Sequence, residues 1–246
     1  MPLIETESLI LKTYDLAEAD KIVVLLSREH GVVRGVAKGA KRLNSRFGSG
    51  LEPFSIVRVT YFQKEVLELV KIQKTELIDS CFEAASDPDF LQKFSYLIDI
   101  LVDALPPHDP NETLYRMTLA CLKAGAEQPA CLPAIGLYFE IWLLKLTGYL
   151  PRWSVCRGCG RELKLDEPAG LGSAPELYCG SCRRLSSMTL ITPAHRSLLT
   201  SALRISPVEF VQQYISSSAL VELSEVLKRV ISHSLGRPVN ERPPLL

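Results

Sequence analysis

The sequence predicts an α+β protein, in which a small β-barrel is followed by a mainly helical domain with an inserted metal-binding module. Five short runs rich in β-branched and aromatic residues occupy the first eighty or so residues. Helix-start and helix-stop signals recur after Asp79. Two Cys-x-x-Cys pairs interrupt the helical part. We therefore expect domains at 1–80 and 81–246, with the cysteine module at about 152–186.

The five β-rich runs fit one small barrel. The fourth alternates apolar and polar residues, as a half-buried strand does, while the second is nearly all apolar. Five strands without a long internal helix are typical of the Greek-key barrel called the OB-fold, and an SH3-like barrel is the alternative. The predicted strands are 8–14, 21–26, 31–36, 54–62 and 66–72.

The rest of the chain carries the signals of helix ends. Proline follows a capping residue at three places, and glycine closes several apolar-periodic stretches. The start signals are Asp87-Pro88, Asn111, Pro133, Thr192-Pro193, Ser206-Pro207 with Glu209, and Ser217; the stop signals are Gly125, Gly148 with Pro151, and Gly236. These residues predict a helical domain.

The four cysteines of the two pairs are Cys156, Cys159, Cys179 and Cys182, with nineteen residues between the pairs. This spacing is typical of a tetrahedral four-thiolate zinc site. Because four sulfurs close the coordination shell, we expect one structural Zn²⁺ without a catalytic role. Iron in a rubredoxin-like site is the alternative metal. Disulfides are disfavoured, since no signal peptide is recognisable and we expect a cytoplasmic protein.

The composition indicates neither a class of binding partner nor a membrane-spanning segment. Lys and Arg together equal Asp and Glu, at 28 each. The most apolar stretch, 137–146, contains Glu140 and Lys145 and is half as long as a bilayer span of roughly twenty residues. It predicts a buried helix. The remaining cysteines, Cys81, Cys121 and Cys131, have apolar neighbours and are expected in the core.

The distribution of charge is more informative than its sum. No acidic residue lies between Glu29 and Glu52, although this stretch is rich in cations and in Gly, Ser and Asn. Such a loop between the third and fourth strands suits phosphate binding, and Phe47, Tyr61 and Phe62 are candidate base-stacking side chains. The alternative is a solvated loop. The candidate DNA-binding residues are Arg34, Lys38, Lys41, Arg42 and Arg46.

Catalytic motifs are missing from the sequence. Gly35–Lys41 lacks the spacing of a phosphate-binding loop and its final Ser or Thr. The four histidines stand singly. We therefore do not expect an enzyme. On the second predicted helix, Arg116 and Lys123 share one face and are a candidate contact for an acidic peptide, the alternative being a solvated face.

Several short stretches resemble the RecO family of bacterial recombination mediators, in order along nearly the whole chain. The most specific is the basic stretch from Lys38 to Phe54. The stretches are Glu18-Ala19-Asp20-Lys21, Ala37-Lys38-Gly39-Ala40-Lys41-Arg42, Ser45-Arg46-Phe47-Gly48, Leu51-Glu52-Pro53-Phe54, Gly148-Tyr149-Leu150-Pro151, Cys156-x-x-Cys159-Gly160 and Leu235-Gly236-Arg237. The tail after Arg237 departs from the family's more basic pattern, so a DNA contact there is not expected.

The resemblance implies a function that the spacing of residues does not. It implies binding to single- and double-stranded DNA, annealing of complementary strands, partnership with RecR, contact with the acidic tail of single-strand-binding protein, and help in loading RecA. It also assigns the five cations of the basic stretch to DNA and the four cysteines to the metal. A zinc-stabilised protein-interaction scaffold is the alternative function, and a zinc enzyme is a third.

Overall fold

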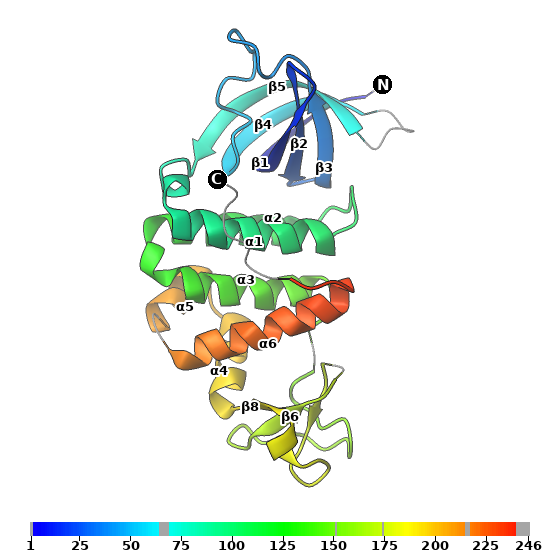
Figure 1. Ribbon diagram of the computed structural model, residues 1–246, viewed down its shortest axis with the longest axis vertical. Helices are drawn as coiled ribbons and strands as arrows, with labels where there is room; N and C mark the ends of the chain where they lie inside the picture. The colour runs from blue at the N-terminus through cyan, green and yellow to red at the C-terminus, as the bar shows by residue number, and fades with distance from the viewer. Residues whose placement is uncertain (1, 64–68, 151, 174, 215–216, 240–246) are drawn as a thin grey trace. The chain divides into compact units, whose positions relative to one another are not determined.

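The computed structural model describes residues 2–63, 69–150, 152–173, 175–214 and 217–239. The described residues form two compact units, 2–127 and 128–239. The first contains the barrel and two helices, and the second contains the other helices and the cysteine module (Figure 1). The predicted domain boundary near residue 80 remains a prediction.

Five strand pairings close the barrel of the first unit. Its strands follow the ring order β1-β2-β3-β5-β4, and β1 pairs with β4 to complete the ring. The pairing of β3 with β5 is parallel and all others are antiparallel. The strands are β1 (Leu3–Leu16), β2 (Asp20–Ser27), β3 (Gly31–Ala37), β4 (Ser55–Phe62) and β5 (Leu69–Ser80).

This closed five-stranded ring confirms the OB-like prediction over the SH3-like alternative. Register shifts interrupt β1 between Ile10 and Lys12 and β4 against β5 at two places, which bends the strands as a narrow barrel requires. The first strand begins earlier than predicted and the fifth runs on to Ser80. The start of the predicted fifth strand, 66–68, lies outside the described residues.

Alternate residues of the strands point into the barrel and form its core. Apolar side chains from all five strands take part, and two come from the β3–β4 loop instead, Phe47 and Leu51. The core consists of Ile10, Val23, Leu25, Val33, Ala37, Phe47, Leu51, Val57, Val59, Tyr61, Val70 and Ile72. The loop is therefore fixed to the barrel by its own apolar residues.

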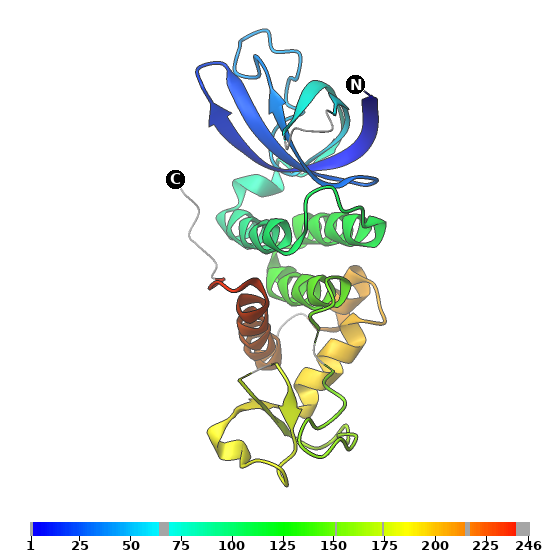
Figure 2. The same cartoon turned by 90° about the vertical axis from the view of Figure 1, so that its right-hand side faces the viewer.

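Helices α1 (Pro88–Ala104) and α2 (Glu112–Glu127) complete the first unit and lie beside the barrel in both views (Figures 1 and 2). Phe54, just before β4, packs edge-on against Phe90 and Phe94 of α1, with ring centroids 5.8 and 6.3 Å away. A short 3-10 helix, Ala84–Ser86, precedes α1. Asp87 and Asn111 cap the two helices as predicted.

The second unit is built on α3 (Leu132–Leu146). Most of its residues are buried, including Glu140, whose carboxylate accepts a hydrogen bond of 2.8 Å from Ser224 of α6. The 18 residues Pro129–Leu146 are apolar enough to cross a membrane, but 67% of this stretch is buried within the fold, as in a core helix. The other elements are a 3-10 helix at Pro129–Cys131, α4 (Pro193–Ala202), α5 (Pro207–Gln213) and α6 (Ser218–Leu235).

The cysteine module contains a small sheet that the sequence patterns do not predict. Its order is β7-β6-β8, all antiparallel, and its strands are β6 (Ala169–Leu171), β7 (Leu177–Tyr178) and β8 (Thr189–Ile191), with a 3-10 helix at Leu185–Ser187. Thr192 and Ser206 cap α4 and α5 as predicted, Ser206 with the predicted capping box to Glu209, and Gly236 ends α6 in the left-handed conformation as predicted. The capping box of Thr192 with His195 was not predicted. Gly125 was predicted to end α2 but lies inside it and is buried.

Candidate nucleic-acid interface and metal centre

The end of the β3–β4 loop is packed tightly against the barrel. Phe47 and Leu51 are each 3% exposed. Gly50 lies so close to β5 that a Cβ atom there would be 2.7 Å from the Thr75 hydroxyl oxygen. That hydroxyl and the Gly50 N–H both donate to the Phe47 carbonyl, at 3.3 and 3.0 Å. Residues 47–51 are thus a rigid base for the residues before them.

The beginning of the loop is tied to the β1–β2 turn. The Gly39 N–H donates to the Asp20 carboxylate at 2.8 Å, and the Lys41 N–H donates to the Ala19 carbonyl at 3.0 Å. Lys41 Nζ also lies 2.8 Å from Asp15 Oδ2, and its hydrogen bond and charge lower the pKa of that carboxyl. Both ends of the loop are therefore held, and residues 42–46 form the exposed rim between them.

The predicted cations differ in whether an acidic residue pairs with them. Lys41 is partly neutralised by Asp15. Among the described residues, the other four cations, Arg34, Lys38, Arg42 and Arg46, form no ion pair and all are exposed. The Arg46 guanidinium lies 5.0 Å from the ring centroid of Phe47, which positions it at the rim. The loop places three of these free cations, and Arg34 is on the adjacent strand β3. This array suits a chain of phosphates.

The prediction of base stacking by Phe47 and Tyr61 is wrong. Tyr61 is 0% exposed, and burial raises the pKa of its hydroxyl to about 12. Both rings belong to the barrel core because a five-stranded barrel needs large side chains to fill it. Phe62 is half-buried. The exposed aromatic residue near the loop is Tyr14, adjacent to Asp15 and 50% exposed.

The candidate peptide contact consists of Arg116 and Lys123, which are both exposed on α2. Lys123 Nζ lies 2.8 Å from Asp79 Oδ2 of β5, and the two groups shift each other's pKa in the directions of an ion pair. The charge of Lys123 is therefore already paired within the first unit. Arg116 is the better candidate of the two for contact with an acidic peptide.

The four cysteines meet in the second unit. Their sulfur atoms all lie within 4.8 Å of one another, with Cys156 and Cys179 buried and Cys159 and Cys182 exposed. Gly158 is required by the first turn, because a Cβ there would be 2.9 Å from Cys182 Sγ. The Cys156 N–H donates to the Arg161 carbonyl at 2.9 Å, which closes the loop behind the first pair.

The donor set fits a tetrahedral ion. Zinc–sulfur bonds of 2.3 Å imply sulfur–sulfur separations of about 3.8 Å, and Cys159 Sγ lies 4.0 Å from Cys179 Sγ. Burial opposes ionisation of Cys156, but backbone N–H groups of Cys179, Cys159 and Gly158 lower its pKa to about 6. Hydrogen bonds with Cys159 and Cys179 raise the pKa of Cys182 to about 12. A cation would relieve this competition between thiolates.

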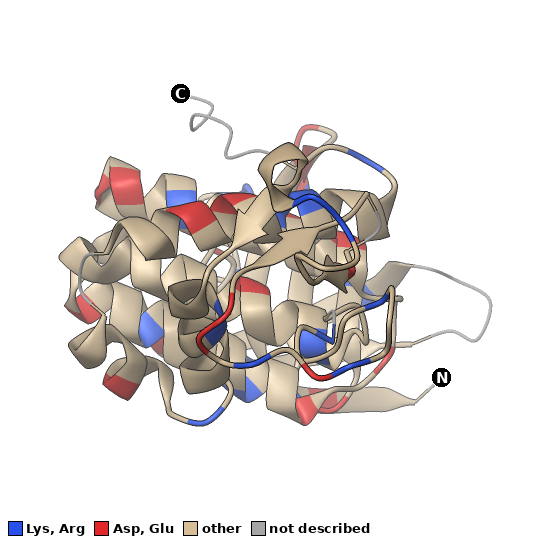
Figure 3. Cartoon of the chain, turned by 90° about the horizontal axis from the view of Figure 1, so that it is seen from below, with Lys and Arg blue, Asp and Glu red and all other residues tan. Residues whose placement is uncertain are grey.

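One residue that sequence reasoning missed holds the module to α4. Arg196 is 4% exposed, and its guanidinium donates to the backbone carbonyls of Leu163, Lys164 and Glu167. Burial lowers its pKa. A lone arginine in a helix gives no sequence signal for such a role. In the view from below, positions of Lys and Arg and of Asp and Glu are both spread over the ribbon (Figure 3).

Comparison with known proteins covers both units. The family description "Recombination protein O N terminal" matches residues 1–81, and "Recombination protein O C terminal" matches residues 86–243. A DNA repair protein RecO of Koribacter versatilis is 34% identical over 187 residues, which are 76% of this chain and 75% of the relative. The DNA repair protein RecO of Geobacter metallireducens is 29% identical over 235 residues, 96% of this chain and 93% of the relative. The ring-closed barrel, the basic loop, the cysteine cluster and these matches together show that the chain belongs to the RecO family of DNA repair proteins.

Proposed function

We propose that this protein is a non-catalytic mediator of DNA repair and recombination that binds single- and double-stranded DNA and anneals complementary strands. The observation that carries the proposal is the β3–β4 loop, where Lys38, Arg42 and Arg46 are exposed without ion-pair partners among the described residues. Cations held at a fixed rim bind phosphates of any sequence.

Annealing follows from charge neutralisation. Two DNA strands repel each other through their phosphates, and cations that neutralise part of this charge let complementary bases approach and pair. Bases need no contact with the protein for this step. The burial of Phe47 and Tyr61 agrees with a contact made through the backbone of the strand.

The partners proposed for this chain follow those of its family. We propose that it acts in the bacterial cytoplasm with RecR and helps load RecA onto strands coated by single-strand-binding protein, whose acidic tail it contacts. Arg116 on α2 is the residue that we propose contacts an acidic peptide. Lys123 would contribute less to this contact, because it already forms an ion pair with Asp79.

We further propose that the cysteine cluster binds one structural Zn²⁺ through Cys156, Cys159, Cys179 and Cys182. When bound, the ion supplies coordination bonds that hold the two loops of the module together. The chain contributes the thiolates and the backbone N–H groups that stabilise them. All four sulfurs are ligands, so no open coordination position remains for a substrate.

The loop is tested with the double variant Lys38→Ala/Arg42→Ala in the full chain. The variant removes two free cations, so we expect the salt slope of single-strand binding to fall by about 1.4, or about 0.7 for each lost phosphate contact. Fluorescence anisotropy of a labelled oligonucleotide, measured over a range of salt concentrations, gives both affinity and slope.

A matched control keeps the charge change on the same barrel. Arg58→Ala/Lys74→Ala also removes two cations, but these lie beside Glu5 and Glu76 on β1 and β5, where their charges are already paired. We expect the control to leave the salt slope nearly unchanged. Equal effects of the two variants would show that only net charge matters, and no effect of either would favour the scaffold function.

A further inference from the structure

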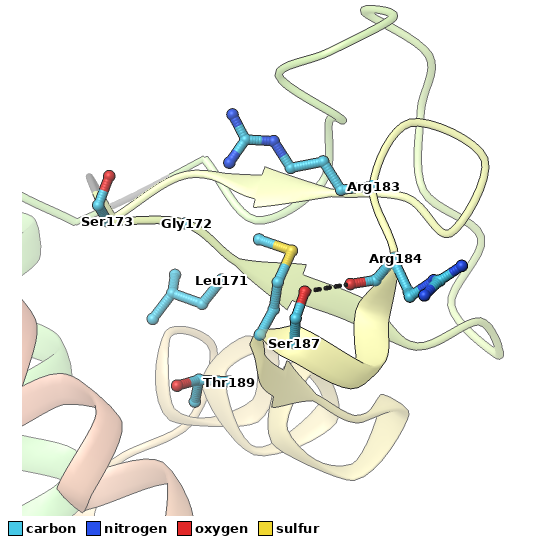
Figure 4. A pocket seen from close by; sticks show the side chains of 8 residues that line it. Leu171, Gly172, Ser173, Arg183, Arg184, Ser187 and Thr189 are labelled. Atoms are coloured by element: carbon cyan, nitrogen blue, oxygen red, sulfur yellow. Dashed lines mark hydrogen bonds between the residues drawn. The ribbon is translucent and has the colours of Figure 1, made fainter.

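An open cavity of about 530 Å³ lies on the cysteine module, outside the basic loop and the metal cluster. It is formed by the end of β6 with the two residues after it, the residues after Cys182 and the start of β8 (Figure 4). Two arginines and three hydroxyl side chains line it, and no acidic residue does. The lining residues are Leu171, Gly172, Ser173, Arg183, Arg184, Ser187, Met188 and Thr189.

The two arginines of this cavity have defined positions and form no ion pair with another described residue. The Arg183 guanidinium lies 4.0 Å from the ring centroid of Tyr178, which holds it over β7. Arg184 turns outward beyond Ser187, whose hydroxyl donates to the Arg184 carbonyl at 3.0 Å (Figure 4). Neither guanidinium forms an ion pair within the described part of the chain, whereas Arg157 and Arg161 of the same module pair with Glu176 and Glu167.

A third guanidinium and a free hydroxyl hydrogen extend the site. Arg229 of α6 donates to Thr189 Oγ1 at 3.1 Å. Because Thr189 accepts this bond, its own hydroxyl hydrogen can be donated to a ligand oxygen. Arg229 is exposed and likewise has no carboxylate partner among the described residues. Arg183 and Arg184 thus line the cavity, and Arg229 lies beside it, bound to the lining residue Thr189. Together they suit neighbouring anions along a chain.

We propose that this cavity, which we call the Arg183 site, binds the phosphodiester backbone of a second nucleic-acid strand. Guanidinium groups with hydroxyl donors match phosphate oxygens, and the open mouth with outward Arg184 suits a continuous strand. The proposal rests on the proposed function, because an annealing protein must hold two strands. An acidic peptide would meet the same charges, but the cavity is open and mainly polar where a docked peptide needs an enclosed apolar anchor.

The metal cluster positions the Arg183 site. The N–H groups of Cys182 and Arg183 both donate to the Cys179 carbonyl, at 3.0 and 3.1 Å. Arg183 therefore follows directly from the second cysteine turn. A metal that fixes this turn fixes the direction of the arginine, which gives the cluster a role in binding beyond the stability of the module.

The test uses short, non-complementary labelled oligonucleotides and the full chain, with strands bound per chain measured by sedimentation. We expect Arg183→Ala/Arg184→Ala to weaken binding of the second strand by about tenfold, from two lost charge-assisted contacts, and to change the first by less than about twofold. The control Arg157→Ala/Lys164→Ala removes two cations of the same module outside the cavity and leaves second-strand binding unchanged. Arg183→Lys/Arg184→Lys retains most of it.

Each other outcome has one meaning. Unchanged second-strand binding in an Arg183→Ala/Arg184→Ala protein of normal metal content and melting temperature overturns the proposal. So does a polyglutamate peptide that binds the wild type and is lost in this variant while the second strand persists. If the wild type binds one strand only, and Lys38→Ala/Arg42→Ala abolishes it, the Arg183 site is refuted and the proposed function stands. If Lys38→Ala/Arg42→Ala changes nothing, the proposed function fails. Loss of the second strand in Arg183→Ala/Arg184→Ala then still supports the Arg183 site, and its persistence overturns it.

Discussion

At the scale of single residues, the basic loop has two kinds of side chain with different roles. Phe47 and Leu51 enter the barrel core, while Lys38, Arg42 and Arg46 remain in solvent. Apolar burial gives the loop its position, since a long loop of polar residues alone would lose too much entropy on ordering. The cations can then face a strand without being reorganised first.

Substitution of Phe47 separates these two roles. Phe47→Ala leaves a cavity in the barrel and should lower the free energy of unfolding of the first unit by about 3–5 kcal/mol. Phe47→Leu keeps most of the apolar volume, so we expect its single-strand affinity to equal that of the wild type. Urea unfolding and anisotropy measure the two effects. A folded Phe47→Leu protein with weak DNA binding would mean that the ring does contact bases.

Arg196 makes a second prediction at this scale. Arg196→Ala leaves the carbonyl groups of Leu163, Lys164 and Glu167 without this donor, which should destabilise the second unit by about 1–3 kcal/mol. Thermal unfolding measured with bound metal tests this. Arg204→Ala, an exposed arginine beyond the end of α4, is the control and should have an effect near zero. Equal melting temperatures for both variants would contradict a stabilising role for the hydrogen bonds from Arg196 to these carbonyl groups.

The residue scale also shows where sequence reasoning ends. Charge patterning identified the basic loop, because an acid-free stretch is visible without a structure. It assigned Phe47 to stacking, because an aromatic residue in a loop fills a core or faces solvent with the same local sequence. Only the ring closure of the strands decides between the two. The role of Arg196 was missed for a related reason, since its partners Leu163, Lys164 and Glu167 lie about thirty residues earlier in the chain.

At the scale of elements, the backbone of the first unit depends on one close approach. Gly31 begins β3 with φ of 65°, and a Cβ there would be 2.1 Å from the Asp109 carbonyl oxygen. The next residue, Val32, accepts a hydrogen bond of 3.0 Å from the His108 N–H. The α1–α2 connection is thus joined to β3 through backbone atoms, and Gly31 is the residue that permits it.

Comparison of two glycines tests this join. Gly31→Ala must displace the 107–109 segment and also strain its own φ, so we expect a loss of more than about 2 kcal/mol of stability. Gly48→Ala also has positive φ, 51°, but a Cβ there meets nothing within 4 Å, so only the backbone term of about 1 kcal/mol applies. Denaturant midpoints of the two variants give the difference. Equal midpoints would show that the 107–109 segment yields without cost.

Element prediction succeeded where local signals are strong. The helix starts at Asp87, Thr192 and Ser206 have the predicted caps, because a side-chain cap acts within three residues. The strands β6–β8 were not predicted. They are two or three residues long and are held by the cysteine turns and by Arg196, which are not visible in a local pattern.

At the scale of the whole molecule, the two units have different sources of stability. The first has a closed barrel with a continuous apolar core. The second has a core around α3, but its cysteine module has three very short strands, which Arg196 and, in our proposal, a metal bound by the four cysteines hold in place. We expect the units to respond separately to chemical perturbation.

Metal removal tests this independence. Chelation should unfold the cysteine module, because structural zinc contributes on the order of 10 kcal/mol to such modules, and should leave single-strand binding by the barrel intact. It should also abolish binding at the Arg183 site, since that site follows from the Cys179–Cys182 turn. Hydrogen exchange of each unit, together with binding of one and two strands, distinguishes these effects. Loss of all binding on chelation would contradict the independence of the units.

The clamp made by Arg196 has a consequence for how the family's sequences diverge. Its guanidinium holds carbonyl groups, which every amino acid provides, and not particular side chains. The exposed positions at Lys164 and Asp166 are therefore open to substitution as long as the path of the chain is kept. A relative with an unrelated segment there can keep the same loop, whereas a relative without the arginine must replace the clamp with another donor.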